Sequence, residues 1–174
     1  MRATARKHGG YKPSYKKKTI TTDPYKARGG SAVSVCGSCR AVNRNKRWYA
    51  DEGAGGTAAA GRSVELTVCP ACLKIRDDFP GGIVTLKGDF VLAHKQDIMN
   101  LVRNEEERAR GFNPLERIMA FKENGYGSLV ITTTNEKLAQ RLGRALKKAF
   151  HGDVSYHWSH DDKLVRVDWA RSKV

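Results

Sequence analysis

The sequence predicts an α+β protein in three parts: a basic tail over residues 1–30, a small four-cysteine module over 31–82, and an α+β domain over 83–174. Three observations support this division. Nine basic residues and one acid lie in the first thirty positions, the four cysteines form two Cys-x-x-Cys pairs, and residues 83–174 show helical and strand periodicities in turn. The net charge of +14 favours a polyanionic partner.

The N-terminal tail is rich in Lys, Arg, Gly and Tyr and has few aliphatic residues. It cannot bury enough apolar surface to offset its ordering entropy, so we expect it to be disordered when free. Its tyrosines lie between lysines. Such a pattern suits nucleic acid, because cations neutralise phosphates and aromatic rings stack on unpaired bases. A tail that only aids solubility is the alternative.

The chain's only four cysteines have the spacing of a metal site: Cys36, Cys39, Cys69 and Cys72. Each Cys-x-x-Cys pair can direct two thiolates at one ion, and four thiolates complete the tetrahedral shell that structural Zn²⁺ prefers. Two disulfides or a redox pair are the alternative. The opening residues do not resemble a secretory signal, however, and the strand-to-helix context of a thioredoxin-like motif is missing. We therefore expect structural Zn²⁺ in a cytoplasmic protein.

The cysteine module, 31–82, reads as a zinc ribbon with short strands at 31–35, 48–49 and 64–68 and a glycine-rich loop at 51–61. So few apolar residues make a weak core, and metal binding should supply much of the folding free energy. Basic residues follow both cysteine pairs. The candidates for phosphate contact are Arg40, Arg44, Lys46, Arg47 and Arg76. Ordinary surface charge is the alternative reading.

The α+β domain begins with a short strand at 83–86, followed by a helix over 89–110, strands at 116–122 and 128–134, a helix over 135–150, and a hairpin of 154–158 with 164–169. After the first strand the order is α-β-β-α-β-β. The simplest arrangement is a four-stranded antiparallel sheet with both helices on one face. Two alternating sets in the hairpin are expected in the core, and either set would form a base-stacking platform if it faced solvent: Val154, Tyr156 and Trp158, and Val165, Val167 and Trp169.

The helix predicted over 135–150 carries a row of cations beside its apolar stripe. Positions i, i+4, i+7 and i+11 are Lys137, Arg141, Arg144 and Lys148. Such a row has no acid within it to pair with, so it repels itself slightly unless an external anion lies along it. An RNA backbone would compensate it. A solvated helix face is the alternative.

No catalytic motif stands out in the sequence. It lacks a phosphate-binding glycine loop, a nucleophile elbow and a spare Cys/His pair, and the cluster His157, His160, Asp161 and Asp162 falls at the expected hairpin turn. No apolar run approaches the length of about 20 residues that a bilayer span needs. We expect a non-enzymatic protein with no small-molecule substrate and no membrane association.

The chain resembles the small bacterial zinc-ribbon proteins related to the NMD family, which includes ribosomal large-subunit export and stability adaptors. The resemblance runs from about Asp23 to Arg171. The motifs that carry it are Asp23-Pro-Tyr-Lys-Ala-Arg-Gly29, Cys36-x-x-Cys39 with Arg47-Trp48, Cys69-Pro-Ala-Cys72 with Arg76-Asp77, Pro80-Gly-Gly-Ile-Val-Thr-Leu-Lys-Gly88, Leu101-Val-Arg-Asn-Glu-Glu-Glu-Arg108, Pro114-Leu-x-Arg-Ile118, Thr132-Thr-Thr134, Leu138-Ala with Gly143-x-Ala-Leu, and Val165-Arg-Val-x-Trp169.

This resemblance implies zinc held by the four cysteines and association with ribosomal or other RNA, with a role in ribosome stability or mRNA decay. Two other functions stay open: a zinc-dependent protein-interaction adaptor, and a DNA-binding, transcription-linked zinc-ribbon protein. The sequence leaves the oligomeric state and the particular RNA undefined.

Overall fold

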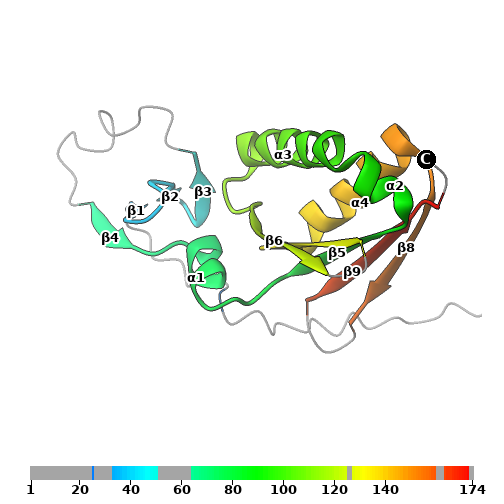
Figure 1. The fold of residues 1–174 in the computed structure, drawn as a ribbon. Helices are drawn as coiled ribbons and strands as arrows, with labels where there is room; N and C mark the ends of the chain where they lie inside the picture. The colour runs from blue at the N-terminus through cyan, green and yellow to red at the C-terminus, as the bar shows by residue number, and fades with distance from the viewer. Residues whose placement is uncertain (1–24, 26–32, 51–63, 125–126, 160–162, 173–174) are drawn as a thin grey trace, which may run out of the picture.

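The computed structural model describes residue 25 and residues 33–50, 64–124, 127–159 and 163–172 (Figure 1). Apart from Tyr25, the predicted tail at 1–30 lies outside this set. So do the predicted loop at 51–61 and the hairpin turn at 160–162.

The cysteine module is built on a small four-stranded sheet in the order β3-β2-β1-β4. Its strands are β1 (Ser34–Cys36), β2 (Val42–Arg44), β3 (Arg47–Tyr49) and β4 (Glu65–Thr67). Asn45 and Lys46 form the two-residue turn between β2 and β3, and both have positive φ (51° and 65°). This backbone matches the twist of an antiparallel hairpin, which explains why Asn suits the turn.

Helix α1 (Pro70–Arg76) follows β4 directly and was not predicted from the sequence. Pro70 occupies the start of the helix, where its missing N–H costs nothing. The second cysteine pair therefore lies where a strand leads into a helix, with Cys69 as the N-cap of α1 and Cys72 in its first turn. The expectation that a strand-to-helix context is missing was wrong for this pair, so it gives no argument against a redox pair here.

The second part of the chain contains a mixed five-stranded sheet in the order β6-β7-β5-β9-β8. Its strands are β5 (Gly82–Lys87), β6 (Ile118–Asn124), β7 (Ser128–Thr133), β8 (Asp153–Trp158) and β9 (Val165–Ala170). The prediction of four antiparallel strands was wrong. Strand β5 is central, antiparallel to β7 and parallel to β9. Its alternate residues Val84 and Leu86 are fully buried, so the first predicted strand is the centre of the sheet.

Helices α2 (Asp89–Ala93), α3 (Lys95–Phe112) and α4 (Glu136–Phe150) lie on one side of this sheet (Figure 1). Their apolar faces and the sheet form one core, to which α3 contributes Ile98 and α4 contributes Leu142. The predicted helix 89–110 is split at His94, whose backbone leaves the helical region (φ −118°, ψ 26°). Among the described residues, no helix combines the length and the apolar composition that a bilayer crossing demands.

Candidate metal centre and nucleic-acid interface

The four cysteines meet in one cluster, with all four Sγ atoms within 4.8 Å of one another. All four thiols are free, and the Sγ atoms of Cys39 and Cys69 are 3.6 Å apart. With Zn–S bonds of about 2.3 Å, a tetrahedral zinc site has S–S edges of about 3.8 Å. The distance of 3.6 Å between the Sγ atoms of Cys39 and Cys69 is far longer than a disulfide bond, which is about 2.05 Å. The cluster is therefore consistent with a structural metal such as Zn²⁺.

Local backbone geometry aims the four side chains at one point. Cys36 ends β1, and its carbonyl accepts a hydrogen bond from the Arg40 N–H (2.9 Å), which closes the first turn. Arg40 has a positive φ of 65°, which turns the chain back into β2. Cys69 caps α1, and its Sγ accepts the backbone N–H of Cys72 (3.4 Å).

The surroundings of the cluster favour the ionised form of one thiol and oppose that of two others. Burial raises the pKa of Cys36, but hydrogen bonds from the backbone of Cys69, Cys39 and Ser38 outweigh it, and the pKa falls from 9.0 to about 6. Burial raises the pKa of Cys69 and of Cys39. A cation that binds here must therefore displace protons from buried thiols, as metal sites in proteins do.

Two long-range contacts join the cysteine cluster to the five-stranded sheet. Arg117 Nη1 donates a hydrogen bond to Cys72 Sγ (3.2 Å), and the buried Lys74 donates from Nζ to the Thr134 carbonyl (3.2 Å). Leu115 also packs against the core of the cysteine module, beside Trp48. Sequence reasoning missed Arg117 as a neighbour of the metal ligands, because no local pattern links positions 72 and 117.

Three of the predicted phosphate-contacting residues gather on the β2–β3 hairpin. Arg44 and Arg47 face each other across the hairpin, and Lys46 lies in its turn. The guanidinium of Arg47 is 5.6 Å from the centre of the Tyr49 ring, a cation–π arrangement on the protein surface. Arg40 lies apart from the hairpin and lines a cavity of about 520 Å³ together with Cys39, Arg110 and Arg117.

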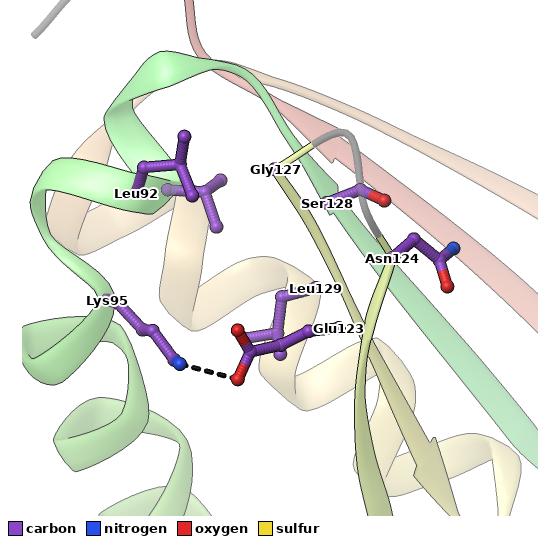
Figure 2. Close-up of a pocket in the computed structure, with 8 residues that line it drawn as sticks. Leu92, Lys95, Glu123, Asn124, Gly127, Ser128 and Leu129 are labelled. Carbon is purple, nitrogen blue, oxygen red and sulfur yellow. Dashed lines mark hydrogen bonds and ion pairs between the residues drawn. The ribbon is translucent and has the colours of Figure 1, made fainter.

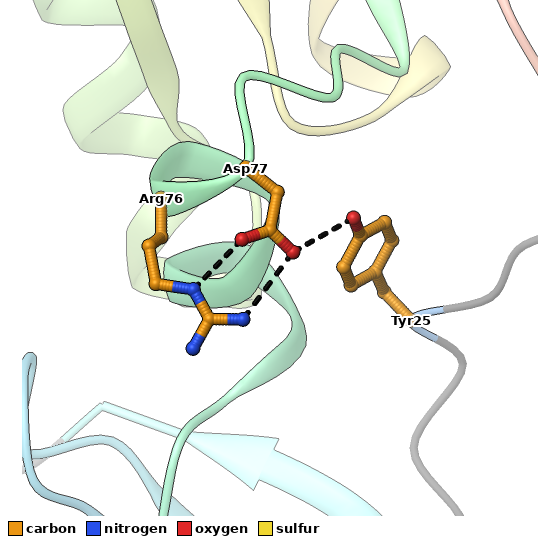
Figure 3. Close-up of polar contacts among 3 residues, drawn as sticks. All are labelled: Tyr25, Arg76 and Asp77. Carbon is orange, nitrogen blue, oxygen red and sulfur yellow. Dashed lines mark hydrogen bonds and ion pairs between the residues drawn. The ribbon is translucent and has the colours of Figure 1, made fainter.

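Arg76 differs from these residues because an acid neutralises it. Its guanidinium pairs with the Asp77 carboxylate (2.7 Å), which also accepts a hydrogen bond from the Tyr25 hydroxyl (2.9 Å; Figure 3). Hydrogen bonds from Arg76 and then from Tyr25 lower the pKa of Asp77. The Tyr25 ring also lies 5.3 Å from that of Phe79. A tyrosine from the predicted tail is thus attached to the end of α1.

The cations predicted on the second helix form a continuous row on α4. We use the term cationic row for Lys137, Arg141, Arg144 and Lys148. The buried residues of α4 include Leu138, Leu142 and Leu146, and helical periodicity places the row opposite them and not merely beside them. Arg141 is half-buried and the other three are exposed. Within the part of the chain that the structure describes, no carboxylate pairs with any of the four.

A cavity of about 430 Å³ lies between the hairpin and the start of α4. Its lining includes Lys46 of the hairpin turn, the buried Lys74, and Asn135, the N-cap of α4. Of the candidates for phosphate contact, Lys46 lines this cavity, whereas none of the residues of the cationic row does. The first turn of α4 begins with Glu136, and the row starts one residue later.

The two predicted hairpin sets both face the helices, but they differ in exposure. Val165, Val167 and Trp169 are fully buried. In the edge strand β8, Val154 and Tyr156 are partly buried and pack against the core, whereas Trp158 is largely exposed. The prediction of a core role therefore holds for the β9 set and only in part for the β8 set.

A cavity of about 290 Å³ lies where the α2–α3 junction meets the β6–β7 hairpin (Figure 2). Leu92 and Leu129 line it, and Lys95 Nζ forms an ion pair with Glu123 Oε1 (2.5 Å) at its rim. Because this lysine is already neutralised, the cavity is a poor candidate for phosphate binding.

Comparison with protein-family models, with curated proteins and with solved structures finds no match for this chain. The resemblance to the NMD-related zinc-ribbon proteins therefore stays a prediction from the sequence motifs.

Proposed function

We propose that this chain is a non-enzymatic, cytoplasmic RNA-binding protein whose four cysteines hold a structural Zn²⁺. The observation that carries the proposal is the cationic row: four positive side chains on the outer face of α4 without a carboxylate partner among the described residues. Like charges at helical spacing destabilise a helix slightly. An RNA backbone laid along α4 would offset that repulsion and release counterions.

The contrast with other surface cations supports this interpretation. Lys87, Lys95, Arg108 and Lys122 each lie within 4.0 Å of an Asp or Glu oxygen. Most of their charge is therefore balanced within the protein. Among the described residues, the cationic row and the hairpin cations Arg44, Lys46 and Arg47 have no such carboxylate, so an external polyanion can neutralise them.

The zinc site would give this interface its rigidity. The core of the cysteine module is small: among the described residues, the buried cluster around the cysteines consists of Cys36 and Cys69 with Ala41, Trp48 and Ala71. Metal binding in such a module is worth on the order of 10–16 kcal/mol. Zn²⁺ would therefore fix the hairpin that carries Arg44, Lys46 and Arg47. Four thiolates leave no ligand position open, which favours a structural role over a catalytic one.

We favour ribosomal or other structured RNA as the ligand, because that is what the family resemblance implies. The hairpin cations, with Arg40 and Arg76, would add phosphate contacts to those of the cationic row. Binding to DNA and binding to a protein partner are the competing outcomes. Neither has a described feature that favours it over RNA.

The salt dependence of binding tests the proposal. We compare the wild type with a variant in which all four residues of the cationic row are changed to Ala. For single-stranded RNA the slope of log K against log salt should fall by about 3, since each phosphate contact contributes roughly 0.7. The matched control changes Lys87, Lys95, Arg108 and Lys122 to Ala, which removes the same formal charge from paired positions.

Equal loss of slope in both variants would mean that only net charge matters, and an unchanged slope in the row variant would remove α4 from the interface. Competition between duplex DNA and ribosomal RNA fragments distinguishes DNA binding from RNA binding, because the preferred nucleic acid displaces the other. A pull-down with and without RNase separates the adaptor alternative, because nuclease should release the partners only if RNA bridges them.

A further inference from the structure

Strand β8 presents an exposed tryptophan beside the cationic helix. Trp158 is the last residue of β8, the edge strand of the five-stranded sheet, and 58% of its surface is exposed. The other two tryptophans, Trp48 and Trp169, are 6% and 0% exposed. A large aromatic ring gains much free energy from burial, so an indole left in water is a candidate binding surface.

The exposed indole is held in place by a second ring. The ring centres of Tyr156 and Trp158 are 5.9 Å apart and their planes differ by 25°, a stacked arrangement. Tyr156 is in turn backed by α4, since a Cβ added at Gly143 would lie only 3.0 Å from the Tyr156 hydroxyl oxygen. The indole is thus oriented before any ligand arrives, which lowers the entropic cost of binding.

The aromatic pair packs on the same helix that carries the cations, although the row lies on the outer face of α4, about 100° or more around the helix axis from Gly143. Arg144 follows Gly143 directly and belongs to the cationic row. Single-stranded nucleic-acid binders combine a positively charged track for the backbone with aromatic rings on which bases stack. Continuous duplexes keep their bases paired and stacked, so they offer no free base face to an indole at a sheet edge.

We propose that Trp158 stacks on an unpaired nucleobase while the cationic row holds phosphates of the same strand. The ligand class is then RNA with unpaired bases, either single-stranded or looped, and not a continuous duplex. This inference rests on the proposed function and makes its substrate class narrower.

Intrinsic fluorescence and affinity test the inference together. The full-length, zinc-loaded protein is titrated with a short oligouridylate, a short oligoadenylate and an RNA duplex, as wild type and as Trp158→Phe and Trp158→Ala. Because Trp48 and Trp169 are buried, the fluorescence that Trp158→Phe removes reports on the exposed indole. We expect the single strands to quench this component and the duplex to leave it unchanged.

Trp158→Ala should weaken single-strand binding by about tenfold or more, as loss of one base–aromatic stack does, and Trp158→Phe should retain part of the affinity. Phe112→Ala is the matched control, because Phe112 is an exposed aromatic residue at the end of α3. The affinity of Phe112→Ala for every oligonucleotide should equal that of the wild type.

The outcomes separate this inference from the proposed function. The cationic-row variant could lose RNA affinity while Trp158→Ala binds like the wild type and single strands leave the Trp158 fluorescence of the wild type unquenched. In that case the stacking role is wrong and the RNA-binding proposal stands. If Trp158→Ala weakens duplex and single-strand binding equally, the selectivity for unpaired bases is wrong. If the wild type binds none of the three probes at low salt, both fail.

Discussion

Gly143 determines how closely α4 packs on the sheet, and its replacement by Ala should destabilise the protein. Gly in a helix interior normally costs about 1 kcal/mol relative to Ala, so the substitution alone would stabilise α4. At this position, however, the new Cβ would lie 2.7 Å from Val167 Cγ1, well inside normal contact distance, and 3.0 Å from the Tyr156 hydroxyl oxygen. Val167 is fully buried, and its branched side chain has little freedom to turn away.

Overpacking of this kind typically costs 1–3 kcal/mol, so the net change for Gly143→Ala should be a loss of about 1 kcal/mol. For a unit of roughly this domain's size that corresponds to a Tm lower by about 4–8 °C. The matched control is Gly111→Ala in α3, where nothing lies within 4 Å of the added Cβ. That variant should be as stable as the wild type or more stable, by up to about 1 kcal/mol.

Urea and thermal unfolding followed by circular dichroism, with zinc present throughout, measure both variants. The difference between them isolates the steric cost, because the gain in helix propensity is largely shared. If Gly143→Ala unfolds at or above the wild-type midpoint, the close approach of α4 to β9 is wrong. The placement of Tyr156 against α4 would then lose its support as well.

Three further predictions concern the metal centre and its neighbours. Purified protein should contain one zinc per chain. A strong chelator or Cys36→Ser should shift the Trp48 fluorescence to the red, because the small core opens without the metal. A spectrum unchanged by complete zinc removal would contradict a structural role. Arg117→Ala should release zinc to a chromogenic chelator about tenfold faster or more than the wild type, because a charge-assisted hydrogen bond to Cys72 is worth roughly 1.5–3 kcal/mol. The release rate of Arg117→Lys should lie between those of the wild type and Arg117→Ala. Equal rates in all three proteins would show that this bond does not hold Cys72 in place. The Tyr25 contact with Asp77 should be complete above pH about 4 and weakened in stronger acid, since the pKa of Asp77 is lowered in the folded protein and protonation removes the charge that strengthens the bond. Asp77→Asn should abolish this pH dependence in the Tyr25 NMR signals.

The features that the sequence predicted well depend on short-range patterns. Two Cys-x-x-Cys pairs indicate one tetrathiolate cluster, and the four Sγ atoms do gather within 4.8 Å. The predicted helix 135–150 matches α4, because the 3.6-residue period of Leu138, Leu142 and Leu146 is strong. Its N-cap is Asn135, whose side-chain oxygen accepts the Leu138 N–H.

The features that the sequence missed depend on contacts between distant segments. The sequence of residues 82–87 does not predict that β5 pairs with β7 on one side and with β9 on the other. A short apolar strand has the same sequence pattern whether it lies at the edge or at the centre of a sheet. The exposure of Trp158 follows from the position of β8 at the sheet edge, which a hairpin pattern alone cannot reveal.

Arg117 and Lys74 connect the cysteine cluster to the segments beside α4, the helix on which we propose that RNA binds. Arg117 bonds a cysteine ligand and belongs to the segment that leads into β6, while Lys74 extends from α1 to Thr134, one residue before the N-cap of α4. Loss of zinc would therefore remove partners from the segment that starts α4. A protein that used zinc only to fold the hairpin would keep full α4-dependent affinity after chelation. We expect instead that the salt slope contributed by the cationic row falls when the metal is removed, because α4 loses an anchor at the end where the row begins.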